Sequence, residues 1–438
     1  MKKAIALLLV LTLLLSSCSK QETFVEEETA PPPLPTEAEK ETPPVAVPAP
    51  WENAEVTDFS IRLLRESMED GKNTLISPMS VLAALSMTAN GAEGETLAQM
   101  EAVLGQSKDA LNDWYKNGTD KSRDYLHLAN AIFIKDDPAL TVSEDFLQTL
   151  EKWYETGIYM TSFNDSTLRE INGFVEENTN GMVKDILDKI PDDAVMYLIN
   201  ALAFEARWAN PYNEYQVGER IFTTEDGREQ TVELMYSEEY DVYIEDDLFT
   251  GFLKDYEGGR YTFAALLPKE GVTVAEVADS LSGDITDKIC SRWGGTVLTA
   301  MPKFETEFDT QMNEVLQAMG MTDAFDPYAA DFSSLATYAG GNIFLNRVIH
   351  KTFISVAEQG TRAGAATVIE AAAGAAAPEE VKEVILNRPF LYMIWDMEAN
   401  TPLFMGTFMD AQAEGTAVPA PNPEICFSPA EDPCLMEG

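Results

Sequence analysis

Apolar residues recur at helical spacing over residues 51–70, and Gly71 follows them at a position typical of a helix C-terminus. A short strand is predicted at 74–77. A buried helix is predicted at 79–89, where almost every residue is apolar. Ser77 stands where its hydroxyl can cap that helix, with Pro78 at the first helical position. The globular part of the chain therefore begins near residue 51.

Longer apolar runs predict a large sheet. Residues 194–208 form a long apolar run without alternation, which is typical of a central strand in a sheet covered on both faces. Residues 349–356 are β-branched and aromatic and predict another buried strand. The remaining predicted elements are strands at 126–134 and, between Gly or Asp turns, over 222–268, and helices at 146–153, 171–179 and 311–319. Helices precede interleaved strands, an order that predicts an α+β fold.

The stretch after the strand at 349–356 changes character. From residue 360 to 377 nearly every residue is Gly, Ala or Thr, so the stretch buries little apolar surface and should project as a loop. Small side chains suit a segment that must slide between two existing strands. Period-2 alternation would place Thr361, Ala363, Ala365, Thr367 and Ile369 on one face of such a strand. An alanine-rich linker or an exposed helix fits the same composition.

Five motifs stand in order along the chain. They are NTLISPMS at 73–80, NALAF at 200–204 with Trp208, MPKF at 301–304, EQGT at 358–361 followed by small residues, and NRPF at 387–390 with PLFMG at 402–406. Together they resemble the sequence pattern of inhibitory serpins. The resemblance covers residues 51–410 and implies an α+β serpin fold, with three β-sheets, about nine helices and an exposed reactive-centre loop.

The resemblance also implies roles for individual residues. The hinge of the loop would comprise Glu358, Gln359, Gly360, Thr361, Ala363, Ala365, Ala366 and Thr367. A polar cluster under the main sheet, the shutter, would comprise Ser77, Ser80, Asn200 and His350. Trp208 would lie at the breach, where insertion of the loop begins; plain core packing is the alternative for this side chain, and a solvent-facing position is the alternative for His350.

The reactive bond of the resembled family usually follows the seventeenth residue from the hinge glutamate, which here gives Gly374–Ala375. The loop is longer than usual before NRPF, so the bond can fall anywhere in the window 371–377. The other residues of that window are Ala371, Ala372, Ala373, Ala376 and Ala377. All are small, which favours an elastase-like or subtilisin-like serine protease, trapped by a monomeric inhibitor as a covalent 1:1 complex.

Two other functions remain open at this point. A cysteine protease that tolerates small residues is one alternative target. A non-inhibitory binding or structural surface lipoprotein with the serpin fold is the other, although such proteins tend to carry bulky, charged or proline residues through the hinge, whereas residues 363–367 here are all small. Arg362 departs from the acidic residue that is more usual in the hinge.

The N-terminal region of the chain predicts export and a lipid anchor. Residues 1–17 combine a basic start with an apolar run too short to span a bilayer, which is typical of a signal peptide. Residues 15–18, LSSC, resemble a bacterial lipobox and imply lipidation of Cys18 and attachment to the outer face of a bacterial membrane or cell surface. An ordinary secreted protein that discards Cys18 is the alternative. Residues 18–50 are rich in Pro and Glu and predict a tether without a fold of its own.

Residues 51–410 are then the globular domain, and 411–438 form a Pro- and Ala-rich tail. Cys426 and Cys434 lie together in that tail, and an exported protein permits a disulfide between them, two free thiols being the alternative. We interpret Cys290 as a small buried hydrophobic residue.

Composition excludes several classes of protein. The 74 acidic residues outnumber the 30 basic ones and give a net charge of -44, which argues against a nucleic-acid binder and against adhesion to anionic lipid headgroups. With two histidines and no motif of a metalloprotease, a nucleophile elbow, a phosphate loop or a paired-cysteine metal site, the sequence argues against an enzyme and predicts no cofactor and no metal.

Overall fold

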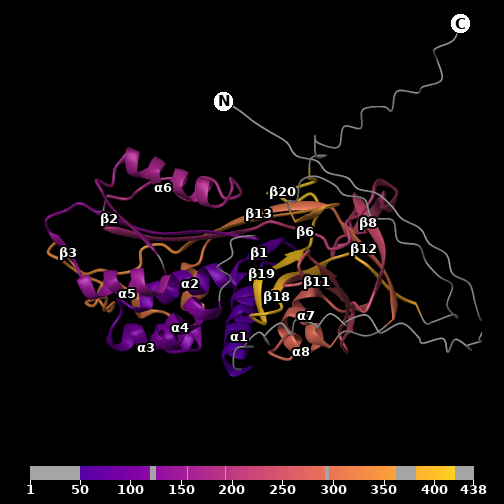
Figure 1. The fold of residues 1–438 in the computed structure, drawn as a ribbon, viewed down its shortest axis with the longest axis horizontal. Coiled ribbons are helices and arrows are strands. Elements are labelled where there is room, and N and C mark those ends of the chain that lie inside the picture. The colour runs from indigo at the N-terminus through magenta and orange to yellow at the C-terminus, as the bar shows by residue number, and fades with distance from the viewer. Residues whose placement is uncertain are drawn as a thin grey trace, which may run out of the picture. The chain divides into compact units, whose positions relative to one another are not determined.

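The computed structural model describes residues 50–118, 125–154, 156–192, 194–291, 295–361 and 381–419. All of them belong to one compact unit of the chain, Val47–Gly438. The described part contains nine α-helices and an α+β arrangement of sheets (Figure 1). The helices are α1 (Pro50–Ser67), α2 (Pro78–Ala89), α3 (Gly94–Leu104), α4 (Lys108–Gly118), α5 (Glu144–Tyr154), α6 (Asp165–Asn178), α7 (Val274–Ser280), α8 (Ile285–Cys290) and α9 (Asn313–Ala318).

A six-stranded antiparallel sheet forms the central part of the larger hydrophobic core. Its order is β1 (Thr74–Ile76), β19 (Thr401–Phe408), β18 (Phe390–Asp396), β11 (Tyr261–Pro268), β10 (Phe249–Asp255) and β9 (Tyr243–Glu245). Every residue of β11, β18 and β19 is buried, because these strands are covered on both faces.

A four-stranded sheet lies beside it, in the order β17 (Lys382–Ile385), β12 (Thr296–Pro302), β8 (Glu229–Tyr240) and β7 (Val217–Thr223). β17 runs parallel to β12, and the other pairs are antiparallel. β17 begins directly after Val381, so the segment at 362–380 connects this sheet to the hinge strand described below.

Two further sheets, of three and five strands, form separate hydrogen-bonded ladders. One has the order β4 (Gly157–Thr161), β2 (Leu126–Lys135) and β5 (Met196–Phe204). The other has the order β20 (Thr416–Ala417), β13 (Phe304–Gln311), β15 (Ile349–Ala357), β16 (Gly360–Thr361) and β6 (Ala206–Arg207). β6 continues β5 after one residue, so the two ladders are joined at one end only. A separate small ladder pairs β3 (Leu140–Val142) with β14 (Ala336–Tyr338).

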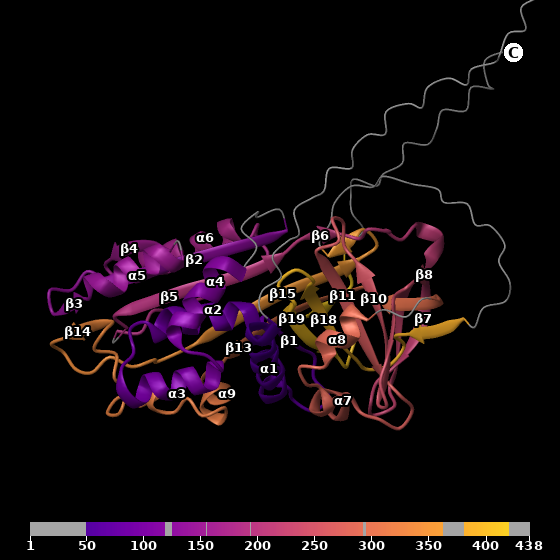
Figure 2. The same ribbon diagram turned by 60° about the horizontal axis from the view of Figure 1, so that its bottom comes forward.

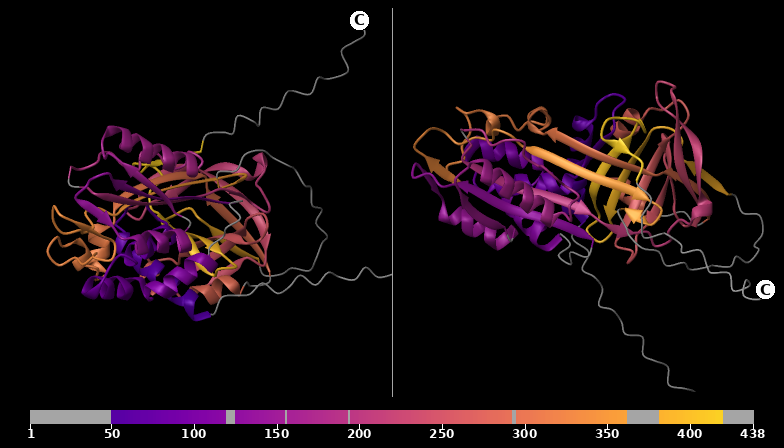
Figure 3. Two further views of the ribbon diagram at one scale, coloured as in Figure 1. Left: turned by 60° about the vertical axis from the view of Figure 1, so that its left-hand side comes forward. Right: turned by 90° about the horizontal axis from the view of Figure 1, so that it is seen from above.

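Away from that joint, β5 and β15 lie side by side without a ladder between them in the described part of the chain (Figure 2). In the view from above, on the right of Figure 3, the orange strands of one ladder lie beside the purple and magenta strands of the other. We call the boundary between β5 and β15 the seam.

Helices cover both faces of the ladder formed by β4, β2 and β5 (Figure 1). α6 packs on one face through a small core that includes Ile171, Val175 and, from β5, Ile199. α2 packs against β5 from the opposite face, within the main core. The apolar run at 194–208 thus lies between two cores, as its lack of alternation predicts.

The prediction that this apolar run forms a central strand, hydrogen-bonded along both edges, is wrong. It forms β5 and β6, and β5 pairs with β2 alone within the described ranges, so it is not a central strand. An apolar run reports that both faces are covered, whereas it carries no information about whether both edges are hydrogen-bonded.

The chain stays within the fold past Asp410. Thr416 and Ala417 pair with Thr306 and Glu305 and close the outer edge of β13. The Asn73 side chain donates hydrogen bonds to the carbonyl oxygen of Asp410 at 2.7 Å and to Thr416 Oγ1 at 2.8 Å. Within the described ranges, none of the helices has both the length and the apolar composition that crossing a membrane requires.

Candidate functional site

The predicted hinge forms a tight turn at the joint between the two ladders. β15 ends at Ala357, residues 358 and 359 turn, and β16 returns antiparallel to β15. Gly360 pairs with Ala357 on one side and with Arg207 of β6 on the other. Two hinge residues, Gly360 and Thr361, therefore already stand as a strand inside the sheet.

Gly360 is required by this packing. Its φ is +150°, and a Cβ atom at this position would lie 2.1 Å from the carbonyl oxygen of Ala206 and 2.7 Å from the Cα of Arg207. No side chain fits such a contact, since both neighbours are backbone atoms of β6. The glycine lets the strand approach closely enough to form its ladder.

Thr361 points into the core, as the alternation of the hinge predicts. It is 1% exposed, and its Oγ1 lies 2.6 Å from the hydroxyl oxygen of Tyr256. Burial raises the pKa of Tyr256, so this phenol stays neutral and able to share a hydrogen bond with Thr361. The other hinge residues named from the sequence, Ala363, Ala365, Ala366 and Thr367, lie outside the described residues, as does Arg362.

Trp208 holds the turn from the side of β6. The indole Nε1 donates to the carbonyl oxygen of Ala357 at 2.9 Å, and its backbone N–H donates to that of Gln359 at 2.9 Å. Its ring is fully buried and stacks on Tyr256 with 4.4 Å between ring centroids. Core packing and contact with the hinge are thus both features of this side chain.

A buried lysine anchors the hinge glutamate. Lys303 is 7% exposed, and its Nζ lies 2.8 Å from Glu358 Oε1 and 3.3 Å from Glu233 Oε2. Burial lowers the pKa of Lys303, but the two carboxylates outweigh that effect and hold the pKa above its ordinary value. The Tyr212 N–H also donates to the carbonyl oxygen of Glu358 at 2.9 Å.

Sequence reasoning did not identify Lys303, Tyr212 or Tyr256 as part of the site. Lys303 lies in the MPKF motif, and the motif alone indicates no partner for the lysine. Tyr212 and Tyr256 occupy turn-rich regions that carry no local signal, because their role depends on strands distant in sequence.

The structure brings together three of the four predicted shutter residues. The Ser77 N–H donates to His350 Nε2 at 3.0 Å, and Ser77 Oγ donates to the carbonyl oxygen of Leu403 at 2.9 Å. Ser77 Oγ also accepts from the Ser80 N–H at 3.3 Å, which makes it the N-cap of α2 as expected. The alternative of a solvent-facing His350 is wrong, since this residue is 4% exposed.

The fourth predicted member, Asn200, is described only by its backbone, which pairs with Asn130 of β2. His350 is the second residue of β15, and Asn200 lies in β5. The hydrogen bond from the Ser77 N–H to His350 connects the junction of β1 and α2 to β15.

Acidification is expected to destabilise the fold through His350. Burial lowers the pKa of this imidazole from 6.5 to about 3, so the native state excludes a proton that the unfolded chain binds. The stability that depends on neutral His350 is therefore full above pH 6.5 and is lost as the pH falls toward 3, at up to about 1.4 kcal/mol per pH unit.

His350→Gln supplies the matched variant, because the amide oxygen can accept from the Ser77 N–H without titrating. Between pH 7.5 and 5 we expect the wild-type protein to lose about 2 kcal/mol more unfolding free energy than the variant. Urea unfolding at several pH values measures the difference. Equal losses in both proteins would contradict a neutral buried imidazole.

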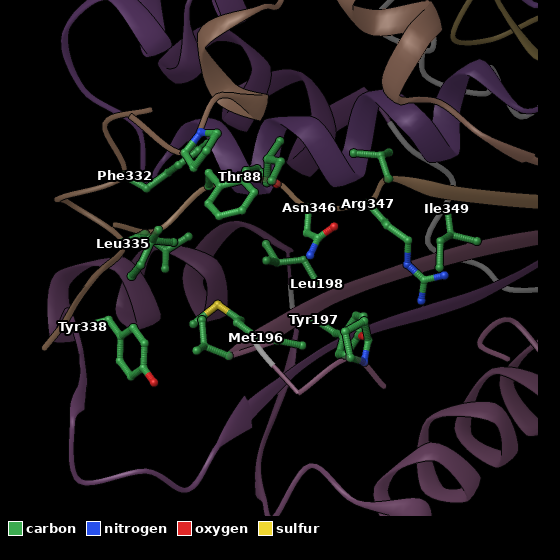
Figure 4. Close-up of a pocket in the computed structure, with 18 of the residues that line it drawn as sticks. Thr88, Met196, Tyr197, Leu198, Phe332, Leu335, Tyr338, Asn346, Arg347 and Ile349 are labelled. Atoms are coloured by element: carbon green, nitrogen blue, oxygen red, sulfur yellow. The ribbon is translucent and has the colours of Figure 1, made fainter. Parts of the chain in front are cut away.

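A cavity of about 470 Å³ opens along the seam away from the hinge. Its walls come from α2, from residues 196–199 of β5 and from the segment that leads into β15 (Figure 4). Leu198, Met196, Phe332 and Leu335 surround the hollow together with a few polar groups. The cavity contacts β5 at residues 196–199 and β15 at its first residue, Ile349, so it lies at the N-terminal ends of these two strands.

Cys290 differs from expectation. It is the last residue of α8 and is exposed, and its thiol lies 3.6 Å from Asn400 Oδ1, so the prediction of a buried residue is wrong. An isolated cysteine carries no periodic signal that would separate a helix end from a core. The reactive window at 371–377, the Cys18 lipidation site and the Cys426–Cys434 pair lie outside the described residues.

Comparison with known proteins gives a consistent result. A family model described as serpin (serine protease inhibitor) matches residues 54–411. The sequence is 30% identical to an uncharacterized serpin-like protein of Thermococcus kodakarensis over 81% of this chain and 84% of that protein. It is 29% identical to plasminogen activator inhibitor 1 of Sus scrofa over 81% of this chain and 91% of that protein.

Solved structures agree with this result. The crystal structure of tengpin, a thermophilic serpin in the native state, has 43% sequence identity and a TM-score of 0.76 over 82% of this chain and 93% of that one. Human thyroxine-binding globulin in complex with its hormone has 25% identity and a TM-score of 0.72 over 82% and 98%. The similarity thus spans most of each structure and not a single motif.

Proposed function

The chain belongs to the serpin family, and from that premise we propose that it is a suicide inhibitor of serine proteases with small-residue primary specificity. Protease inhibition is the general function of the family. The observation that carries the proposal is the strand β16, which stands between β15 and β6 above an open seam. This is the arrangement that an inserting loop requires.

The hinge is suited to continue into the seam. Gly360 passes close to β6 without a side chain, and Thr361 fills a buried position beside Tyr256. Residues 363–367 are all small, so the following positions can enter between β5 and β15 without steric resistance. The cavity along the seam supplies space for part of that segment.

The mechanism follows that of the family. The target attacks one peptide bond of the exposed loop and forms an acyl-enzyme through its own nucleophile. The cleaved hinge then inserts as a new strand, as serpin loops do. About a dozen added hydrogen bonds of roughly 0.5–1.5 kcal/mol each would release on the order of 10 kcal/mol. The protease is carried along and distorted before it can deacylate.

The residues of the reactive window set the target. Gly374–Ala375 is the proposed scissile bond, and every residue from 371 to 377 is Ala or Gly. A protease with a shallow primary pocket, elastase-like or subtilisin-like, accepts such residues. Trypsin-like targets are disfavoured, since the window holds neither Lys nor Arg.

We further propose that the protein is exported and anchored through Cys18 at the outer face of a bacterial membrane. Signal peptide, lipidated cysteine and Pro/Glu-rich tether follow one another in the sequence, and together they would hold the inhibitor away from the surface. Mass spectrometry of Cys18 in the mature protein tests this: an unmodified or absent Cys18 overturns the anchor.

The inhibitory function is tested by mixing residues 51–438 with pancreatic elastase and with a subtilisin, followed by denaturing gels and mass spectrometry. We expect an SDS-stable adduct and a released C-terminal fragment that starts between Ala372 and Pro378. Clean cleavage in that window without an adduct from either enzyme would favour a non-inhibitory binding protein. Thyroxine-binding globulin shows that a chain of this fold can bind a small molecule.

A further inference from the structure

The cavity at the N-terminal ends of β5 and β15 has the size of a small-molecule binding site. Its volume of about 470 Å³ lies within the range of roughly 300–1,000 Å³ that is typical of ligand pockets. Its walls combine α2, β5 and residues 340–349. The side chain of Tyr328, which also lines the cavity, is 95% exposed, so the cavity opens to solvent at this residue.

Apolar side chains that the fold leaves only partly covered form much of the wall. Met196 and Leu198 of β5, together with Phe344 and Leu345, pack against the main core and are nevertheless only partly buried. Met196 and Leu198 lie beside the hollow in Figure 4. A hydrocarbon chain in the cavity would remove this apolar surface from water, which is a favourable transfer.

The charge of the lining is the opposite of the charge of the chain. Among the described residues, Arg347 is the single charged residue that lines the cavity, whereas the chain as a whole has 74 acidic residues. Figure 4 shows Arg347 beside Ile349 at one end of the cavity and Tyr338 at the opposite end. A cation at one end of an apolar hollow complements a ligand with one anionic head and an apolar body.

The present bonds of Arg347 leave room for an anionic head. Its Nη1 lies 3.3 Å from Asp188 Oδ1, and its Nη2 donates to the carbonyl oxygen of Lys189 at 3.2 Å. Both distances exceed the roughly 2.7–2.9 Å of a strong charge-assisted hydrogen bond, and the Asp188 side chain is 71% exposed. A guanidinium has five N–H donors in a fork that matches a carboxylate, and only two of them have partners within the described ranges.

We propose that this cavity binds a single-chain aliphatic carboxylate. The carboxylate lies on Arg347, and the hydrocarbon chain extends between α2, β5 and residues 340–349. An aliphatic chain suits the site because aliphatic side chains outnumber aromatic ones in the wall, and because a flexible chain can follow an irregular hollow. The proposal holds whether or not the protein inhibits a protease.

Isothermal titration calorimetry with decanoate at pH 7.5 tests the site. The protein is the mature chain from residue 18 with Cys18→Ser, so that no attached lipid competes. We expect one bound molecule per chain, and an affinity that rises about fifteenfold from octanoate to decanoate, since each further buried methylene contributes about fourfold. Several molecules per chain, no saturable binding, or an affinity independent of chain length would overturn the proposal.

The uncharged probe decanol isolates the role of Arg347. In Arg347→Gln we expect decanoate to bind about tenfold more weakly and decanol to bind as in the wild-type protein. The control is Arg169→Gln, an exposed position on α6 that removes the same charge, and it should change both affinities less than twofold. Equal effects of the two variants on decanoate, or decanol that binds the wild-type protein as tightly as decanoate, would overturn the carboxylate site.

A third variant identifies the cavity itself as the place of binding. Ala84 lines the cavity from α2, and Ala84→Phe would fill the hollow from that side. We expect this variant to lose the binding of both probes while its circular dichroism spectrum stays that of the wild-type protein. A folded Ala84→Phe variant that binds decanoate with unchanged affinity would place the probe elsewhere and overturn the proposal.

Discussion

Replacing Thr361 with arginine is expected to turn the inhibitor into a substrate. The Thr361 side chain is buried between β15 and β6, with its hydroxyl against that of Tyr256. A guanidinium forced into this space would have no acidic partner, and removing an unpaired charge from water costs several kcal/mol. Because Thr361 already pairs with β15 and β6, the arginine would force the start of the hinge strand out of the sheet. The rest of the loop could then not follow it into the sheet, and the acyl-enzyme would hydrolyse first.

The measurement is the molar ratio of inhibitor to protease at complete inhibition. We expect that ratio to rise at least about tenfold for Thr361→Arg, with cleavage in the 371–377 window at an undiminished rate. Thr361→Ser keeps the hydroxyl near Tyr256 and serves as the control, with trapping close to that of the wild-type protein. An arginine variant that still forms the adduct with wild-type stoichiometry would refute the insertion of this face of the hinge.

Replacing Trp208 with alanine is expected to cause the largest loss of stability. The indole is fully buried, stacks on Tyr256 and donates to the carbonyl oxygen of Ala357. Truncation of a buried aromatic side chain to alanine costs about 3–5 kcal/mol, because it removes contacts and leaves a cavity. Here it also removes the N–H that donates to the half-buried carbonyl oxygen of Ala357.

Trp208→Phe separates the two contributions. Phenylalanine can keep the stacking on Tyr256 but supplies no N–H, so we expect a smaller loss, about 1–2 kcal/mol. Urea unfolding monitored by circular dichroism compares the three proteins. A stability of Trp208→Ala within 1 kcal/mol of the wild-type value would show that neither contact supports the hinge turn.

The sequence predicted those parts of the fold that depend on local patterns. The start of the domain illustrates this: the helix, the short strand and the Ser77 cap all follow from residues within 30 positions of one another. The motif at 358–361, predicted as a hinge, forms a turn and the short strand β16, and Thr361 is buried. His350 was assigned to a buried cluster, and its bond to Ser77 is present.

Features that depend on distant segments were not predictable. The seam between β5 and β15 is a missing ladder, and a strand's sequence does not record which of its edges is paired. Lys303 reaches Glu358 from 55 positions away, and Tyr256 reaches Thr361 from 105 positions away. The strand β20 lies in a segment whose Pro- and Ala-rich composition gives little sign of pairing with β13.

The pairing of the first strand of the domain with a strand near its C-terminal end has a consequence for folding during translation. β1, at Thr74–Ile76, takes its strand partner from β19, at Thr401–Phe408, and the Asn73 side chain binds Asp410 and Thr416. The first strand of the domain therefore waits until more than 300 further residues have left the ribosome before it can pair. With the outer edge of β13 closed by β20 only afterward, the nascent chain presents unpaired strand edges for most of its translation, so we expect a holding chaperone to be needed until the last residues of the domain emerge.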